Sequence, residues 1–193
     1  MLQGARHVHI EALNKAAEAL NLEIEIHELR KSSDLYSSSP HALVIPGGES
    51  TTMRLTGNDP ASQLLPALFK WIRNNPENPV LGTCAGAILL CDPQDGGESL
   101  VSAKIDRNAY GRQVDSFQAQ LQSSLLGRNF SGIFIRAPRF VSVPNFNQVV
   151  VMHSDEAVGV LDSNRLALTF HPELSGDTGF HEWLIQRAME VNE

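Results

Sequence analysis

Three short stretches of this chain carry side chains that could do covalent chemistry together. The first is Gly82-Thr83-Cys84-Ala85-Gly86, which lies between a short apolar run and a longer one. This pattern predicts a strand, a sharp turn and a helix, and it is the thiol form of a nucleophile elbow. A helix N-terminus favours a thiolate. Because a lone cysteine is more often a small core residue, the prediction of a nucleophile at Cys84 depends on the other two stretches.

The second stretch, His171-Pro172-Glu173, supplies a base. A cysteine nucleophile needs a base, and a histidine base needs an orienting group. Proline biases the preceding residue toward extended angles, and side chains two apart in an extended segment point the same way. We therefore predict that His171 is the base and that Glu173 orients it. The alternative is a surface pair around a turn, with His153 or His181 as weaker candidates for the base.

The third stretch supplies donors for an oxyanion. Gly47 and Gly48 follow a short apolar run at residues 42–45. Glycine lets a backbone N–H group approach a ligand closely, and an oxyanion needs at least two convergent donors. The N–H group of Ala85, directly after the cysteine, would be one donor, and that of Gly48 would be another.

The composition narrows the class of protein. A chain of 193 residues suits one domain, predicted over residues 1–193. A net charge of −7 gives no electrostatic case for nucleic acid or an anionic membrane surface. No metal-ligand spacing and no phosphate loop is present, so we expect neither a metal nor a cofactor. Only two cysteines and no export signal favour the cytoplasm, and we expect Cys91 to be ordinary core packing.

Hydrophobic periodicity gives the elements that would position these groups. We predict helices at residues 7–20, 59–75, 85–91 and 177–191, strands at residues 22–26, 42–45 and 80–81, a loop at residues 31–40, several short strands between residues 100 and 170, and a hairpin turn at residues 162–164. The alternation predicts a three-layer α/β domain with a mainly parallel sheet. In such sheets the site lies at the carboxyl ends of the strands, where both glycine-rich turns would open.

The order of the three motifs resembles that of the class I, triad-type glutamine amidotransferases. Further segments are similar to the glutaminase subunit of pyridoxal 5'-phosphate synthase, namely residues 2–4, 107–117, 134–138 and 170–174. The resemblance covers nearly the whole chain. It implies a flavodoxin-like arrangement of the sheet.

The resemblance implies a glutaminase that hydrolyses L-glutamine to L-glutamate and ammonia through a thioester on Cys84. His171 and Glu173 would complete the triad, and Gly48 and Ala85 would hold the oxyanion. The ammonia would pass to a separate barrel-shaped synthase subunit that makes pyridoxal 5'-phosphate, so no cofactor is implied here.

The resemblance also implies a glutamine-binding set. Its members are Gln3, Gly47, Gly48, Glu49, Arg107, Ile135 and Arg136. A buried arginine would suit the substrate carboxylate, because its guanidinium pairs with a carboxylate through two hydrogen bonds. Without the resemblance, a surface salt bridge is the simpler interpretation of Arg107 and Arg136.

The chain departs from this family at its start. The family begins with an apolar strand that ends at the Leu-Gln-Gly turn, whereas here Met1 directly precedes Leu2-Gln3-Gly4. We therefore expect a sheet without its first strand. Two alternatives to an active glutaminase follow. The chain could be a non-catalytic or poorly folded variant subunit, or a thiol hydrolase of the same fold that acts on other amides.

Overall fold

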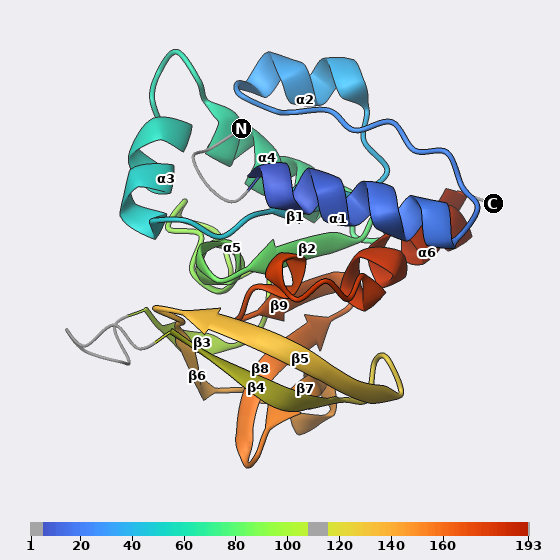
Figure 1. The fold of residues 1–193 in the computed structure, drawn as a ribbon. Coiled ribbons are helices and arrows are strands. Elements are labelled where there is room, and N and C mark those ends of the chain that lie inside the picture. The colour runs from blue at the N-terminus through green and yellow to red at the C-terminus, as the bar shows by residue number, and fades with distance from the viewer. Residues whose placement is uncertain (1–5, 108–115, 193) are drawn as a thin grey trace.

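The computed structural model describes residues 6–107 and 116–192 (Figure 1). The α-helices are α1 (Arg6–Ala19), α2 (Ser32–Ser38), α3 (Ser50–Gly57), α4 (Leu64–Asn74), α5 (Ala85–Cys91) and α6 (Gly179–Asn192). The strands are β1 (Leu43–Ile45), β2 (Val80–Thr83), β3 (Lys104–Asp106), β4 (Ser116–Ser123), β5 (Arg128–Ile135), β6 (Arg139–Ser142), β7 (Val149–His153), β8 (Glu156–Asp162) and β9 (Arg165–Leu168). Two 3₁₀ turns are η1 (Phe146–Gln148) and η2 (Pro172–Leu174).

A seven-stranded sheet runs through the molecule in the order β1-β2-β9-β8-β7-β4-β5, and β3 pairs with β6 beside it. The α/β class is confirmed, but the sheet is not mainly parallel as predicted. Only β1–β2 and β2–β9 are parallel, and the four other pairs of this sheet are antiparallel. The connections explain the difference. Parallel neighbours need long crossovers, whereas β4–β5 and β8–β9 are joined by short turns that allow only antiparallel pairing.

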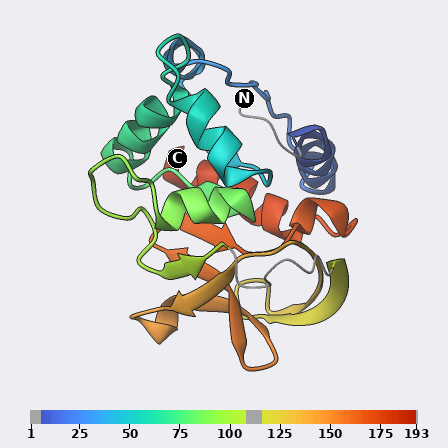
Figure 2. The same cartoon turned by 90° about the vertical axis from the view of Figure 1, so that its left-hand side faces the viewer.

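Helices cover both faces of the parallel part of the sheet. Apolar residues of α3, α4 and α5 pack with β1 and β2 in one buried cluster. Residues of α1 and α6 pack on the other side in two further clusters. Figure 2 shows this layering, with α1 (dark blue) and α4 (blue-green) on opposite sides. The predicted helix at residues 7–20 is therefore α1, and that at residues 177–191 is α6.

Two local predictions are wrong, and one helix was not predicted. Residues 32–38, predicted as loop, form α2, and residues 50–57 form α3, which was not predicted. Helix α4 begins at Leu64 rather than near Asp59. The Asp59 carboxylate instead accepts a hydrogen bond from Ala61 N at 2.8 Å. This contact closes a separate turn, and Gln63 then enters the helix from a left-handed conformation.

Residues 22–26 are extended but do not form the predicted strand. Their side chains alternate between half-buried and exposed, as the sequence pattern requires. Among the described residues, however, the backbone of residues 23–29 has no hydrogen-bonded partner. The alternating pattern is correct, but a strand also needs a neighbour.

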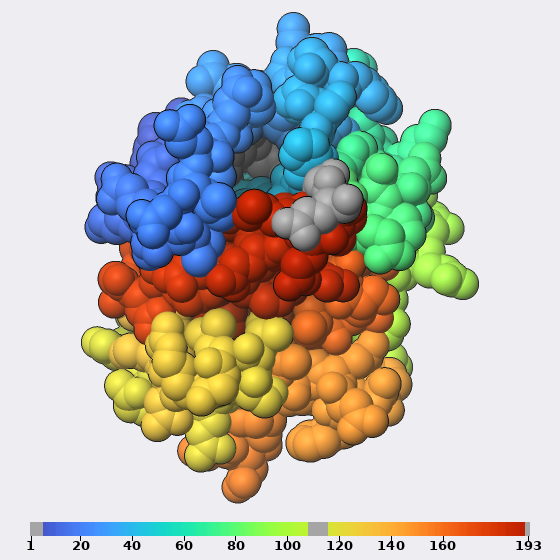
Figure 3. Space-filling model, turned by 90° about the vertical axis from the view of Figure 1, so that its right-hand side faces the viewer, coloured from blue at the N-terminus to red at the C-terminus, as the bar shows by residue number. Residues whose placement is uncertain are grey.

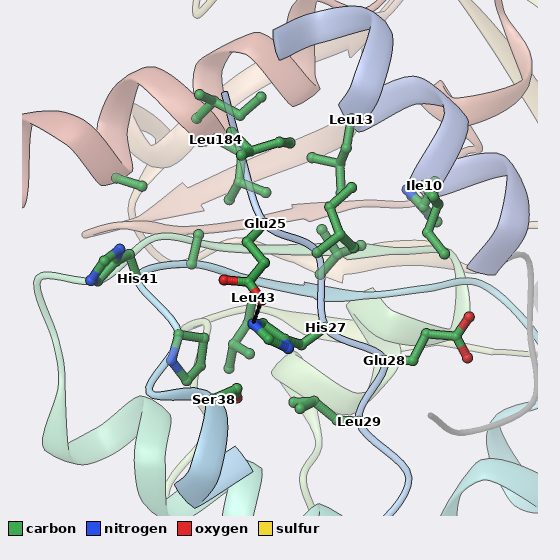
Figure 4. A pocket seen from close by; sticks show the side chains of 18 of the residues that line it. Ile10, Leu13, Glu25, His27, Glu28, Leu29, Ser38, His41, Leu43 and Leu184 are labelled. Carbon is green, nitrogen blue, oxygen red and sulfur yellow. Dashed lines mark ion pairs between the residues drawn. The ribbon is translucent and has the colours of Figure 1, made fainter. Parts of the chain in front are cut away.

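A groove of about 660 Å³ lies between residues 22–29 and β1. Figure 3 shows its mouth as a hollow between the blue N-terminal region and the red helix α6. Figure 4 shows Leu13 of α1 and Leu184 of α6 at one end and Leu29 at the other, with Leu43 between them. Within the described residues, β1 pairs only with β2, so it forms one edge of the sheet.

The parallel strands bring three chain segments together at the carboxyl ends of the strands. In the register, Ile45 lies opposite Gly82, and Thr83 lies opposite Leu168. Cys84 N then donates to Leu168 O at 2.8 Å. The residues that follow β1, β2 and β9 therefore meet at the carboxyl ends of these strands, which is where the three chemical motifs lie.

Candidate active site

Cys84 sits in a sharp turn between β2 and α5. Its backbone angles, φ 50° and ψ −105°, lie outside the regions that ordinary residues occupy. Close packing explains both flanking glycines. A Cβ atom on Gly86 would lie 1.9 Å from Ile45 O, and one on Gly82 would lie 2.6 Å from Leu90 Cδ1. The turn is therefore a nucleophile elbow in geometry as well as in sequence.

His171 and Glu173 form a buried pair. Nδ1 of His171 lies 2.7 Å from Oε1 of Glu173, and both residues are less than a tenth exposed. His171 is held by its backbone N–H group, which donates to Ile133 O at 2.8 Å. Pro172 then begins η2, which turns Glu173 back beneath the ring. The bend at the proline is what lets two residues so close in sequence touch.

The electrostatics of this pair suit a base. Burial alone would lower the pKa of His171, but its hydrogen bonds with Cys84 and Glu173 outweigh burial and raise the pKa to about 10. Burial also disfavours the Glu173 carboxylate, yet the hydrogen bond with His171 and the nearby His9 hold the pKa of Glu173 below its ordinary value. An ionised Glu173 accepts the hydrogen bond of Nδ1–H, and a pKa of about 10 keeps the His171 ring protonated at neutral pH, so Nε2 can hold the proton that the Cys84 thiol gives up.

Gly47 lies between the nucleophile and the base. A Cβ atom there would lie 2.5 Å from His171 Cε1 and 3.3 Å from Cys84 Cβ, so only glycine fits. Gly48 follows and is exposed. Ala85 is the first residue of α5, where helix N–H groups have no intrahelical acceptor. Of the two N–H groups predicted to hold the oxyanion, that of Ala85 directly follows Cys84 in the chain, and that of Gly48 follows Gly47, which packs against Cys84 in space.

The remaining predicted residues lie around this centre in different ways. The backbone oxygen of Ile135 lies 4.0 Å from Cys84 Sγ. Arg136 follows it with a φ of 44°, and Arg107 lies 3.3 Å from the Thr51 hydroxyl. Both arginines are exposed, so the expectation of a buried arginine is wrong. Their guanidinium groups belong to surface segments that follow β5 and β3.

The Glu49 carboxylate is occupied by its own helix. It caps α3 by accepting hydrogen bonds from the N–H groups of Thr51 and Thr52 at 3.0 and 2.6 Å. The hydrogen bond from the Thr52 hydroxyl has the largest effect, and together with the hydrogen bonds from these N–H groups it lowers the pKa of Glu49 to about 2. The side chain predicted to bind substrate therefore has a structural task.

Other predicted positions lie elsewhere. Gln3 and residues 108–115 are outside the described residues. His153, a weaker candidate for the base, lies about 6 Å in ring-to-ring distance from Phe117 and Phe134 on the antiparallel part of the sheet. Both cysteines are free thiols, and Cys91 packs in the core as expected, where burial raises its pKa to about 12.

Sequence reasoning missed His9. This residue is buried, and its Nε2 lies 3.5 Å from Glu173 Oε2. A signal was available, because His9 continues the apolar face of α1 that Leu13, Ala16 and Ala17 define. A polar residue on such a face needs a buried partner. The partner is 164 residues away in sequence, and the local pattern gives no indication of it.

Residues 6–107 and 116–192 contain neither a cluster of metal-binding side chains nor a helix that could span a membrane. No group of three or more histidine, cysteine or acidic residues is placed to hold a metal ion there. No helix in these ranges has the length and apolar character that crossing a membrane requires.

Comparisons with known proteins agree with this geometry. Residues 1–190 match the model of the SNO glutamine amidotransferase family. A protein of Thermococcus onnurineus named pyridoxal 5'-phosphate synthase subunit PdxT is 40% identical over 97% of this chain and 96% of its own length. The protein of the same name from Methanothermobacter thermautotrophicus is 37% identical over 100% of this chain and 96% of its own length. A crystal structure titled as a glutamine amidotransferase superposes with a TM-score of 0.81 at 35% identity, and it covers 97% of this chain and 96% of that one.

Proposed function

The chain belongs to the SNO glutamine amidotransferase family, and from this premise we propose that it is the glutaminase subunit of a pyridoxal 5'-phosphate synthase. The observation that carries the proposal is the Cys84 elbow beside a buried His171–Glu173 pair, whose Nδ1 and Oε1 atoms are 2.7 Å apart. This is the constellation that acyl transfer from an amide to a thiol requires.

In the proposed first half-reaction, Cys84 attacks the side-chain amide carbon of L-glutamine. His171 holds the proton that the thiol gives up, and Glu173 stabilises the resulting imidazolium. The N–H groups of Gly48 and Ala85 bind the negative charge on the amide oxygen. His171 then passes its proton to the amide nitrogen, the C–N bond breaks, and ammonia leaves a glutamyl thioester on Cys84.

In the second half-reaction, water replaces ammonia. His171 takes a proton from the water as the oxygen attacks the thioester carbon, and the C–S bond breaks to give L-glutamate. Gly47 leaves room for the substrate between base and nucleophile, while Ile135, Arg136 and Arg107 surround the site. The exposed arginines can reach a substrate carboxylate only at the mouth of the site, where the substrate would cover them.

The proposed partner is a separate synthase subunit that consumes the ammonia. The names of the two relatives support this assignment, since each is called a subunit of pyridoxal 5'-phosphate synthase. The free thiols suit a reducing cytoplasm, the proposed location.

The groove beside β1 favours a second candidate, a subunit that folds poorly and does not catalyse. One experiment separates the two. Ammonia release from L-glutamine is measured with and without the synthase subunit, for the native chain, Cys84→Ala and the matched control Cys91→Ala. We expect release that falls to background in Cys84→Ala and persists in Cys91→Ala. A native chain that is folded by near-ultraviolet circular dichroism yet releases no ammonia with the synthase present would refute the proposal.

A further inference from the structure

A line of buried polar side chains extends behind the triad. His9 Nε2 lies 3.5 Å from Glu173 Oε2 and 3.1 Å from the Thr83 hydroxyl. On its other side, His9 Nδ1 lies 3.0 Å from His181 Nε2. His9 is 2% exposed and His181 is fully buried. The line therefore runs from Cys84 through His171, Glu173 and His9 to His181.

Hydrogen bonding selects one arrangement of protons in this line. Glu173 Oε2 is buried and has no hydrogen-bond partner among the described residues, so His9 Nε2 at 3.5 Å is the polar group that faces it. If His9 carried its proton on Nδ1, the bare Nε2 lone pair would face this carboxylate oxygen and repel it. With the proton on Nε2, the His9 N–H group donates to the Thr83 hydroxyl oxygen and presents its positive edge to Glu173 Oε2, while Nδ1 accepts from His181 Nε2–H. The unpaired Nδ1 of His181 is then the bare acceptor that ends the line.

Three elements converge to place His9. It is carried by α1, Thr83 ends β2 directly before the nucleophile, and His181 lies in the first turn of α6. Helices α1 and α6 pack against each other, and α1 also contacts η2, which holds Glu173. A small movement of α1 would thus move the carboxylate that orients the base.

We propose that His9 and His181 are positioning residues of the glutaminase, in which His9 holds the second oxygen of Glu173 and His181 fixes the tautomer of His9. The proposal rests on the proposed function, because it assigns these residues a role in the same triad. Neither residue touches the reacting atoms. Each acts through its neighbour, and the effect reaches Cys84 through His171.

The charge balance supports this role. The titratable groups that face His9 are Glu173 and His171 on the segment around η2 and His181 on α6. Burial lowers the pKa of His9, and burial lowers that of His181 to about 3. Both rings are therefore neutral at pH 7, so the line holds one negative charge, on Glu173, beside the His171 imidazolium. Because His9 is neutral, its N–H group stabilises the Glu173 carboxylate while His171 stays the cation that pairs with it.

The first test uses Cys84 alkylation by iodoacetamide, which needs neither glutamine nor the synthase. His9→Ala leaves Glu173 with one partner fewer, so the His171 imidazolium and the Cys84 thiolate lose support. We expect the midpoint of the alkylation rate to move to higher pH by about one unit. His9→Gln, whose amide N–H can reach the same oxygen, should restore most of this shift. His181→Gln and Thr83→Val should give smaller shifts in the same direction.

The second test uses glutamine turnover by the complex with the synthase. We expect His9→Ala to lower kcat by about tenfold to a hundredfold with little change in KM, because the base is misplaced while the substrate pocket is intact. In a Glu173→Ala background the same substitution should change kcat by less than about twofold, because its route to the base is already lost. The matched control is Asn164→Ala, which removes a different buried polar group, one that bonds Glu77 and Arg187 far from Cys84.

Two results would overturn the proposal. One is an unchanged alkylation profile in a folded His9→Ala chain. The other is a loss of kcat that is equally large with and without Glu173, or that Asn164→Ala reproduces. If His9→Ala does not fold, Thr83→Val and His181→Gln carry the same test. A native chain that shows the alkylation behaviour but hydrolyses no glutamine would contradict the proposed function and with it the role in a glutaminase, while the alkylation result would still show that His9 positions the His171–Glu173 pair.

Discussion

At the scale of single residues, the site depends on the unusual backbone angles of Cys84 and on a close contact at Gly86. Cys84 holds backbone angles that cost about 1–3 kcal/mol and that persist only when the surrounding structure enforces them. The contact that enforces these angles is the close approach of Gly86 to the carbonyl oxygen of Ile45, where a Cβ atom would have no room. Helix α5 can approach β1 this closely only because no Cβ atom stands between them.

This contact predicts the effect of Gly86→Ala. The new methyl group would overlap Ile45 O, and neither backbone can rotate away as a side chain could. We expect the free energy of unfolding, measured with urea, to fall by about 1–3 kcal/mol, and Cys84 alkylation to change because the elbow is displaced. The control is Gly97→Ala, whose Cβ would meet only the flexible end of Arg73. Equal urea midpoints for the two variants would contradict the steric argument.

Residues of the site differ in how far the sequence predicts them. Cys84, His171 and Glu173 could be placed because each lies in a local motif with a backbone requirement of its own. His9 could not, because its partners Glu173 and His181 come from distant parts of the chain. The arginines are exposed, as the interpretation of Arg107 and Arg136 as surface residues predicts, and it is the buried arginine suggested by the resemblance that is wrong.

At the scale of elements, the sequence predicts those whose pattern is satisfied locally. Helix α1 and strand β1 follow their apolar patterns closely. Helices α2 and α3 are seven and eight residues long and rich in serine and threonine, so their apolar pattern is too short to recognise. Residues 22–26 fail for the opposite reason. Their pattern is strong, but pairing depends on a neighbour that no described residue provides.

Hydrogen exchange should reveal this unpaired region. Leu43 N–H donates toward β2, so the N–H and C=O groups of Val44, which point the other way, face the groove. We expect the amides of residues 23–29 and of Val44 to exchange quickly, and those of residues 81–83 in the centre of the parallel part to be protected. Protection of residues 23–29 comparable to that of β2 would show that this segment is paired in solution.

At the scale of the whole molecule, the site's titratable groups make stability depend on pH in two opposite directions. His171 has a pKa of about 10 in the folded chain, above the ordinary value of 6.5. His181 has a pKa of about 3, below the same ordinary value. The first group binds its proton more tightly when folded, and the second more weakly. Catalytic geometry and global stability are therefore linked through the same buried cluster.

The raised pKa of His171 and the lowered pKa of His181 together give a maximum in the free energy of unfolding near pH 6.5. As pH rises from 6.5 through 10, unfolding releases the His171 proton, and the free energy of unfolding falls by about 1.4 kcal/mol per pH unit. As pH falls below 6.5, the unfolded chain protonates His181 while the folded chain does not, so this free energy falls with a similar slope. His9 adds to the acid side because burial lowers its pKa as well, and Glu173 adds to it at lower pH.

Urea unfolding between pH 4 and 9 tests this linkage. His181→Gln should flatten the acid side of the profile and leave the alkaline side, whereas His171→Gln should do the reverse. The two variants serve as controls for each other, because each removes one buried imidazole from the same cluster. If both profiles kept the slopes of the native chain, the titrating groups would lie elsewhere, and the buried line from Cys84 to His181 would not govern stability.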